Sequence, residues 1–149
     1  WRLSTGIDGL PGLYDGQRLD TWMAQYGQSD YLADSDRDGI ANLVEYALSG
    51  NPGIAALSPL PVAAVETFET GGGDGAFATL TVRIARGADD VRLIPERSTD
   101  LVSWDGSAAS IVTASVTHDS SGGSTWKWRS AYPWNAAERE YLHLRVQLR

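Results

Sequence analysis

The sequence predicts a mainly β chain with a small α part, in which an antiparallel β-sandwich follows a helix, an acidic loop and a second helix. Beyond residue 61, six stretches have the composition of strands, and apolar and polar residues alternate in those at 77–85 and 141–149, as in half-buried strands. Before residue 53, two short stretches have apolar residues at helical spacing, with an acidic loop between them. We therefore divide the chain into a lead-in and helix–loop–helix unit (1–53), a connector (54–61) and a β-sandwich module (62–149).

Composition limits the classes of partner. The 149 residues are 42% hydrophobic, which is enough to fill the core of one domain or of two small packed units. The net charge is -7, and residues 1–53 contribute -5 of it, with eight acidic residues against three arginines. Such a chain repels nucleic acids and anionic membranes. No apolar run reaches the roughly 18 residues of a membrane helix, so we expect neither nucleic acid nor membrane as a partner.

Two short amphipathic helices are predicted in the first unit. Asp15 is a plausible N-cap for a helix that ends near residue 26, before Gly27. The second helix follows the acidic loop and ends before Gly50. Their apolar stripes are Leu19, Trp22, Met23 and Tyr26 in the first, and Ile40, Leu43, Val44, Ala47 and Leu48 in the second. Short helices are not stable singly in water, so we expect these two to pack on each other.

The acidic loop has the spacing of a twelve-residue calcium loop. The residues predicted to bind the metal are Asp34, Asp36 and Asp38 at positions one, three and five, Ile40 through its carbonyl at seven, Asn42 at nine and Glu45 at twelve. Gly39 occupies the sharp turn. Three carboxylates within five residues repel one another unless a cation lies between them. A solvated acidic turn is the alternative, but it gives no reason for Gly39, Asn42 and Glu45 at the matching positions.

The surroundings of the loop indicate a lone structural Ca²⁺ site. The first helix ends seven residues before Asp34, and Ala41 stands where paired loops carry a branched aliphatic residue. No second loop of this kind occurs in the sequence, which argues against a cooperative sensor. A carboxylate-rich site saturates easily at extracellular calcium levels, so we expect a secreted or cell-surface location. The chain has no cysteines, so disulfides give no indication of compartment.

Six strands are predicted in the second unit. Their ranges are 62–68, 77–85, 91–98, 111–118, 124–130 and 141–149. The glycine-rich segment 71–75 has the composition of a hairpin turn. In the last strand, Leu142, Leu144, Val146 and Leu148 alternate with His143, Arg145, Gln147 and Arg149, so we expect the leucines and the valine to face inward.

Parts of the chain resemble a known group of modules. The segment from Asp34 to Pro52 and the segment from Glu96 to Trp104 are similar to C-terminal modules of large secreted proteins from verrucomicrobial and planctomycete-type bacteria. The metal loop also resembles those of dockerins and thrombospondin type 3 repeats. The likeness covers roughly residues 18–149. It implies a non-catalytic, calcium-binding appendage carried behind an upstream domain of a larger secreted protein, such as a polysaccharide-degrading enzyme or an adhesin-like region.

Catalysis has little support in the sequence. His118 and His143 stand on predicted strands with no serine nucleophile motif beside them. No spacing singles out a pair among the carboxylates Glu96, Asp100, Asp105, Glu138 and Glu140, and ion pairs with arginines explain them as well. We therefore expect the chain not to be an enzyme.

Aromatic residues suggest polysaccharide binding, because sugar rings stack on flat side chains. The candidate ligand-binding residues are Trp126, Trp128, Tyr132 and Trp134. Trp126 and Trp128 are two residues apart and share one side of a strand, where they form either a sugar platform or part of the core. Tyr132 and Trp134 are predicted to be exposed in a loop, whereas Trp104 is predicted to fill the core. The alternative function is a structural, sorting, anchoring or protein-interaction module.

Overall fold

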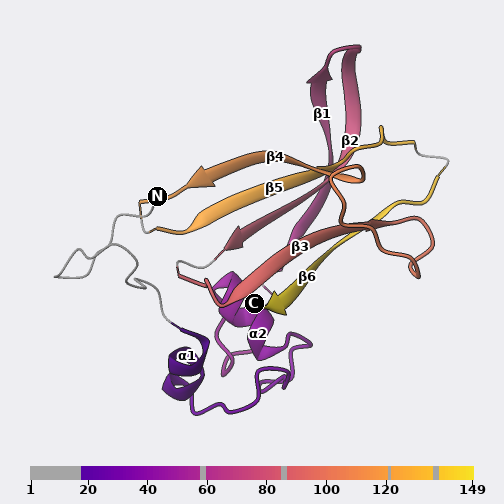
Figure 1. The fold of residues 1–149 in the computed structure, drawn as a ribbon. Helices are drawn as coiled ribbons and strands as arrows, with labels where there is room; N and C mark the ends of the chain where they lie inside the picture. The colour runs from indigo at the N-terminus through magenta and orange to yellow at the C-terminus, as the bar shows by residue number, and fades with distance from the viewer. Residues whose placement is uncertain (1–17, 58–59, 85–86, 121, 136–137) are drawn as a thin grey trace.

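The computed structural model describes residues 18–57, 60–84, 87–120, 122–135 and 138–149 (Figure 1). The predicted lead-in and the predicted cap Asp15 lie outside these residues. Helix α1 spans Leu19–Gln25 and helix α2 spans Asn42–Leu48. Gly27 follows α1 and has φ of 67°. This left-handed conformation is the one expected where glycine terminates a helix. Neither described helix is long and apolar enough to cross a membrane.

Six strands form two antiparallel sheets. They are β1 (Val62–Thr70), β2 (Gly73–Ile84), β3 (Val91–Ser98), β4 (Ile111–His118), β5 (Ser124–Ser130) and β6 (Tyr141–Leu148). One sheet has the strand order β1-β2-β5-β4, and the other pairs β3 with β6. The first hairpin is longer than predicted because Gly73, Asp74 and Gly75 pair with β1 instead of forming the turn.

The two sheets form the layers of a sandwich, which confirms the predicted fold class. The β3–β6 sheet lies against the four-stranded sheet, and the tip of the β1–β2 hairpin projects beyond both (Figure 1). Alternation decides which side chains lie between the layers. On β2, Leu80 and Val82 are buried. On β6, the four residues predicted to face inward all pack on the core and are partly buried.

The helices share the hydrophobic core of the sandwich. Trp22 of α1 meets Tyr46 of α2 with ring centroids 5.6 Å apart, so the two helices pack on each other as predicted. Both rings belong to the same buried cluster as Val82, Val91 and Trp128 of the strands. The acidic loop between the helices is therefore attached to the sandwich through a continuous apolar contact.

Trp104 does not fill the core, so that prediction was wrong. Its ring lies on that of His143, at a centroid distance of 3.7 Å and an interplanar angle of 9°. His143 belongs to the outward row of β6, so the indole covers the outer face of the sheet. The preceding turn explains this position, because Asp100 accepts hydrogen bonds from the amides of Val102 and Ser103 and so turns the chain back over the sheet.

Candidate metal centre

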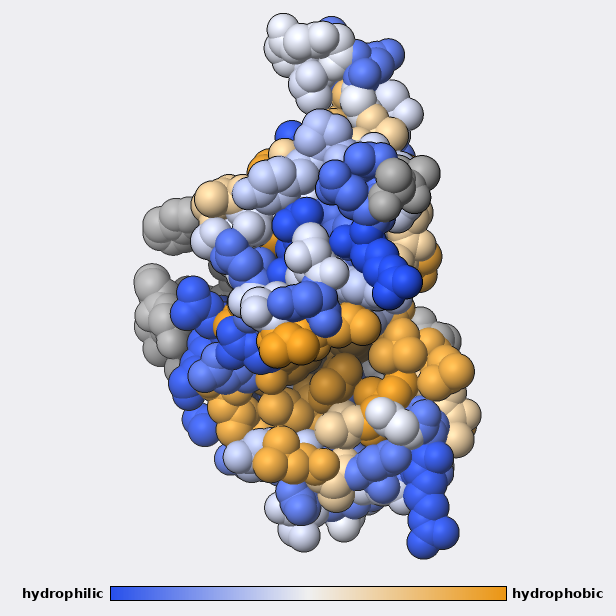
Figure 2. Space-filling model, turned by 90° about the vertical axis from the view of Figure 1, so that its right-hand side faces the viewer, coloured by the Kyte–Doolittle hydropathy of each residue, from blue (hydrophilic) through white to orange (hydrophobic). Residues whose placement is uncertain are grey.

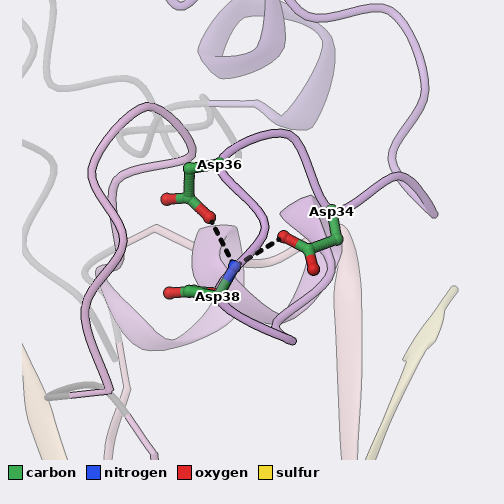
Figure 3. Close-up of side chains that lie close together, drawn as sticks. All are labelled: Asp34, Asp36 and Asp38. Carbon is green, nitrogen blue, oxygen red and sulfur yellow. Dashed lines mark hydrogen bonds between the residues drawn. The ribbon is translucent and has the colours of Figure 1, made fainter.

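The acidic loop is shaped by hydrogen bonds between carboxylates and its own backbone. The Asp38 amide donates to Asp34 at 3.1 Å and to Asp36 at 3.3 Å, so both carboxylates point toward one place inside the loop (Figure 3). The Gly39 amide donates to the second oxygen of Asp34 at 2.9 Å. Gly39 has φ of 91°, a conformation that side chains other than glycine rarely adopt, which explains the glycine at the turn.

The three aspartates form a cluster that could hold a metal ion. One carboxylate oxygen from each of Asp34, Asp36 and Asp38 lies within 4.8 Å of the others. Asp36 and Asp38 are partly buried, whereas Asp34 is exposed. At such separations the like charges repel strongly, and a cation between them removes the repulsion. Exposed acidic clusters also occur without metal, so the loop requires support from other residues.

That support comes from two fully buried polar side chains of α2. Asn42 is 0% exposed and Glu45 is 1% exposed. The oxygen atoms Asn42 Oδ1 and Glu45 Oε2, together with Asp36 Oδ2, are buried and have no hydrogen-bond partner among the described residues. A buried acceptor without a partner costs about 1–3 kcal/mol. All three atoms belong to residues that the sequence predicted to bind the metal.

The amide group of Asn42 is held in a defined orientation. Its Nδ2 donates to the carbonyl of Asp30 at 2.7 Å and to Ser35 Oγ at 3.0 Å. With both amide hydrogens used, Oδ1 is left as the acceptor that needs a donor or a cation. The backbone amide of Asn42 also donates to the carbonyl of Ala33 at 2.9 Å, which ties the start of α2 to the start of the loop.

Glu45 carries an electrostatic signal of the same site. Burial, followed by the charges of Asp36, Asp38 and Asp34, raises the pKa of Glu45 to about 7. A carboxyl group with this pKa is only half ionised near neutrality when no cation is bound. The same aspartate charges that raise the pKa of Glu45 would attract a divalent cation.

Ile40 and Asp38 connect the loop to its surroundings. Ile40, predicted to bind the metal through its carbonyl, has a buried side chain, and its amide donates to Asp38 Oδ1 at 2.8 Å. The other oxygen of Asp38 accepts a hydrogen bond from the Ala56 amide at 2.9 Å. Asp38 therefore joins the loop to the connector that leads into β1.

Sequence reasoning missed Gly50 and the supporting contacts of Asp30 and Ser35. A β-carbon at Gly50 would lie 2.7 Å from the β-carbon of Glu45, so the backbone at Gly50 passes directly against that side chain. In the sequence, Gly50 indicated only the end of a helix. No local pattern distinguishes a glycine that ends a helix from one that also leaves room for a buried carboxylate.

The four candidate sugar-binding aromatics divide into two pairs. Trp128 is buried at 5% exposure, and Trp126 packs against the same core, with its ring centroid 5.7 Å from that of Trp128. The second sheet covers them, so they are not a surface platform. Tyr132 and Trp134 are 48% and 37% exposed, in agreement with the loop prediction. The Arg97 guanidinium lies 4.4 Å from the centre of the Tyr132 ring.

The candidate catalytic carboxylates are engaged in structural contacts. Glu96 accepts hydrogen bonds from Arg145 at 2.8 Å and lies 2.7 Å from His143 Nε2. Glu140 pairs with Arg97. Asp105 accepts a hydrogen bond from the hydroxyl of Ser110. Each contact uses the oxygen atoms that an acid or a base would need for catalysis.

An apolar groove lies beside the free edge of the second sheet. Apolar side chains gather around a hollow on one side of the molecule (Figure 2). The groove has a volume of about 280 Å³, and its apolar lining comes from α2, the connector, β1, β2 and β6: Val44, Leu48, Leu60, Pro61, Ala63, Leu80, Leu142, Leu144 and Val146. It arises because the two-stranded sheet covers only part of the four-stranded one.

The metal loop, the exposed aromatics and the apolar groove are the features from which a function can be argued. Comparison of the chain with protein-family models, with curated proteins and with solved structures found no match.

Proposed function

We propose that this chain is a calcium-stabilised, non-catalytic module of a secreted protein. One Ca²⁺ would bind the oxygens of Asp34, Asp36, Asp38, Asn42 and Glu45 and the carbonyl of Ile40. The observation that carries the proposal is the set of buried, unpartnered oxygens on Asp36, Asn42 and Glu45. A cation would satisfy all three at once and neutralise the clustered carboxylates.

The donor set favours calcium over other metals. Every proposed ligand is an oxygen atom, and no histidine or cysteine stands in the loop. Oxygen-only sites suit hard cations, whereas zinc and copper prefer nitrogen or sulfur ligands. Ca²⁺ accepts six to eight oxygens in flexible geometry, whereas Mg²⁺ demands an octahedral shell and retains water. A site with six protein ligands fits the former.

The proposed ion would stabilise the fold and would not switch it between two conformations. Glu45 stands on the helix that packs into the common core, and Asp38 holds the connector through Ala56. An ion between them would join the loop, α2 and the start of the sandwich. Because a ligand that binds only the folded state stabilises it, the gain is about 2.7 kcal/mol at a calcium concentration about 100 times Kd.

The metal proposal is tested by titrating the chelator-treated protein with CaCl2 or MgCl2 while recording the melting temperature by circular dichroism. We expect calcium to raise the melting temperature and magnesium to raise it less. Asp36→Asn should remove most of the calcium effect, whereas Asp30→Asn, in the same loop but outside the cluster, should retain it. Equal melting curves with and without calcium would contradict the proposal.

We further propose polysaccharide binding as the role of the module. Support comes from Tyr132 and Trp134, which are exposed two residues apart in one loop, a combination that suits stacking on sugar rings. Affinity electrophoresis against neutral and acidic polysaccharides tests this role, with tryptophan fluorescence as a second readout. Tyr132→Ala and Trp134→Ala should weaken retardation, and Tyr31→Ala, an exposed aromatic at the metal loop, should not.

The apolar groove favours a second candidate, in which the module contacts another protein, such as the upstream domain of a larger secreted chain. Exposed apolar grooves beside a free strand edge are common sites of protein contact. The two candidates differ in a measurable way. Under the second, Leu60→Asp at the rim of the groove should change the stability or localisation of a longer parent protein, while polysaccharides should leave tryptophan fluorescence unchanged.

A further inference from the structure

We propose that the outer face of the β3–β6 sheet binds an acidic polysaccharide, with Trp104 stacking on a sugar ring and Arg92 and Arg149 binding its anionic groups. This inference rests on the proposed polysaccharide-binding role and names the ligand class. We use the term basic row for the outward residues of β6, the arginine that follows this strand and the arginine beside it on β3: His143, Arg145, Gln147, Arg149 and Arg92.

The register of the sheet places the basic row on one surface. His143, Arg145 and Gln147 alternate with the inward residues of β6, and Arg92 is directly opposite Gln147 on β3. Arg149 follows the end of β6, where its amide donates to the carbonyl of Asp90 at 2.9 Å. At about 3.4 Å per residue, the row from His143 to Arg149 is about 20 Å long. Arg92, Arg145, Gln147 and Arg149 are exposed, and His143 is half-buried. The result is a linear surface open to solvent, as a polymer chain requires.

The charge of this sheet is opposite to that of the chain as a whole. The outward positions of β3 and β6 carry two arginines, Arg92 and Arg145, and one glutamate, in a chain of net charge -7. The glutamate, Glu96, is 7% exposed and already accepts hydrogen bonds from Arg145. Its negative charge is therefore compensated within the fold. The exposed guanidinium groups of Arg92 and Arg149 give this face a local positive charge that complements an anion.

Trp104 provides a flat ring at one end of the row. His143 occupies one face of the indole, with the rings 3.7 Å apart, and the indole is partly exposed to solvent. The His143 imidazole is itself held by Glu96 at 2.7 Å, so the indole rests on a fixed support. A flat ring in a fixed position loses little entropy when a sugar ring stacks on it.

The other end of the row is a cleft of about 410 Å³ lined by Arg92, Gln147, Leu148 and Arg149. Arg145 donates a hydrogen bond to Gln147 Oε1 at 3.2 Å, which turns the Gln147 NH₂ group away from Arg145. The polar side chains of this lining are two guanidinium groups and one amide, which together supply donors for a carboxylate or a sulfate. Asp89 and Asp90 line a neighbouring cleft on the other side of Arg149.

Arg97, which packs on Tyr132, is adjacent in β3 to Glu96, which holds His143, so these two side chains leave opposite sides of the sheet. We therefore assign the acidic polysaccharide to Trp104 and the basic row alone.

The experiment compares polygalacturonate with the neutral polymer dextran and with polyglutamate, an anionic polymer without sugar rings. Binding to the calcium-loaded chain is measured by calorimetry for the wild type, Arg92→Gln, Trp104→Ala and the control Arg83→Gln. Arg83 is exposed on β2, in the other sheet. We expect Arg92→Gln and Trp104→Ala each to weaken polygalacturonate binding about tenfold, and Arg83→Gln to leave it unchanged.

The outcomes separate this inference from the role on which it rests. Dextran and polyglutamate should bind at least about tenfold more weakly than polygalacturonate, and added salt should weaken the acidic polymer selectively. Polygalacturonate binding that survives both variants but is lost in Tyr132→Ala would overturn the basic row and leave the sugar-binding role standing. Equal binding of polyglutamate would also overturn the inference. No binding to any polysaccharide would overturn both. Arg92 is exposed, so its variant tests the face without a change in the core.

Discussion

Gly50 lies directly against the side chain of Glu45: a β-carbon at Gly50 would be 2.7 Å from the Glu45 β-carbon and 2.9 Å from its γ-carbon. A residue just beyond α2 therefore controls where the buried carboxylate of the acidic loop can lie. The contact joins the residue that follows α2 to a side chain that we propose as a metal ligand.

Gly50→Ala should weaken calcium binding more than a helix-end substitution normally would. The added methyl must displace Glu45 or the backbone, and overpacking of this kind costs about 1–3 kcal/mol. We expect about tenfold weaker calcium affinity by calorimetry. Gly53→Ala is the matched control, because the nearest atom to its β-carbon is 3.6 Å away. Equal affinities for the two variants would contradict the role of the contact.

Glu45→Gln should have opposite effects in the presence and absence of calcium. Without metal, burial and the charges of Asp36, Asp38 and Asp34 disfavour an ionised Glu45, as its raised pKa of about 7 indicates. At pH 8 the metal-free variant should therefore be as stable as the wild type or more stable. With calcium, the variant lacks a charged ligand and should gain less stability. Urea unfolding with and without chelator measures the stability difference between the variant and the wild type in both conditions. A variant that is less stable than the wild type in both would contradict the prediction.

Glu96 should make stability depend on acid pH. Hydrogen bonds from Arg145, and then from His143, lower the pKa of Glu96 below 4.5. A lowered folded-state pKa gives stability that is present above the unfolded pKa and is lost as the pH falls through the folded value.

Glu96→Gln should therefore destabilise the protein by about 1–3 kcal/mol at pH 7 and by less at pH 3, where the wild type has lost part of the same contribution. Urea unfolding at the two pH values, with calcium held constant, measures the difference. The exposed strand residue Glu69 supplies the control variant Glu69→Gln. A destabilisation by Glu96→Gln that is the same at both pH values would show that charge is not its cause.

Substitution of the buried Trp128 and of the exposed Trp134 should differ in its effect on stability. Trp128 is 5% exposed and Trp134 is 37% exposed. Trp128→Ala leaves a cavity between the sheets and should cost about 3–5 kcal/mol in the free energy of unfolding. Trp134→Ala should cost about 1 kcal/mol or less. Urea unfolding followed by circular dichroism checks both values, and similar losses would show that the exposed loop is part of the stabilising core.

The strands and the aspartate cluster of the loop could be predicted because their signals are local. Alternation along one strand indicates which side chains lie on the same face of the sheet. The observed ranges of β3, β4 and β5 agree with those predicted. The spacing of Asp34, Asp36 and Asp38 is equally local, since all three belong to one short turn. Only the hairpin of β1 and β2 was misjudged, because its glycines pair across the strands.

The sequence by itself determined that Trp126 and Trp128 share one side of a strand, and tertiary structure decided that this side is covered. Alternation cannot tell which side meets a second layer, because that depends on strands far away in the chain. The same reason explains why Trp104 lies over His143 and Gly50 against Glu45. The residue types and local periods of the chain specified its elements and the aspartate cluster of the loop, whereas contacts between distant segments decided which aromatics are buried.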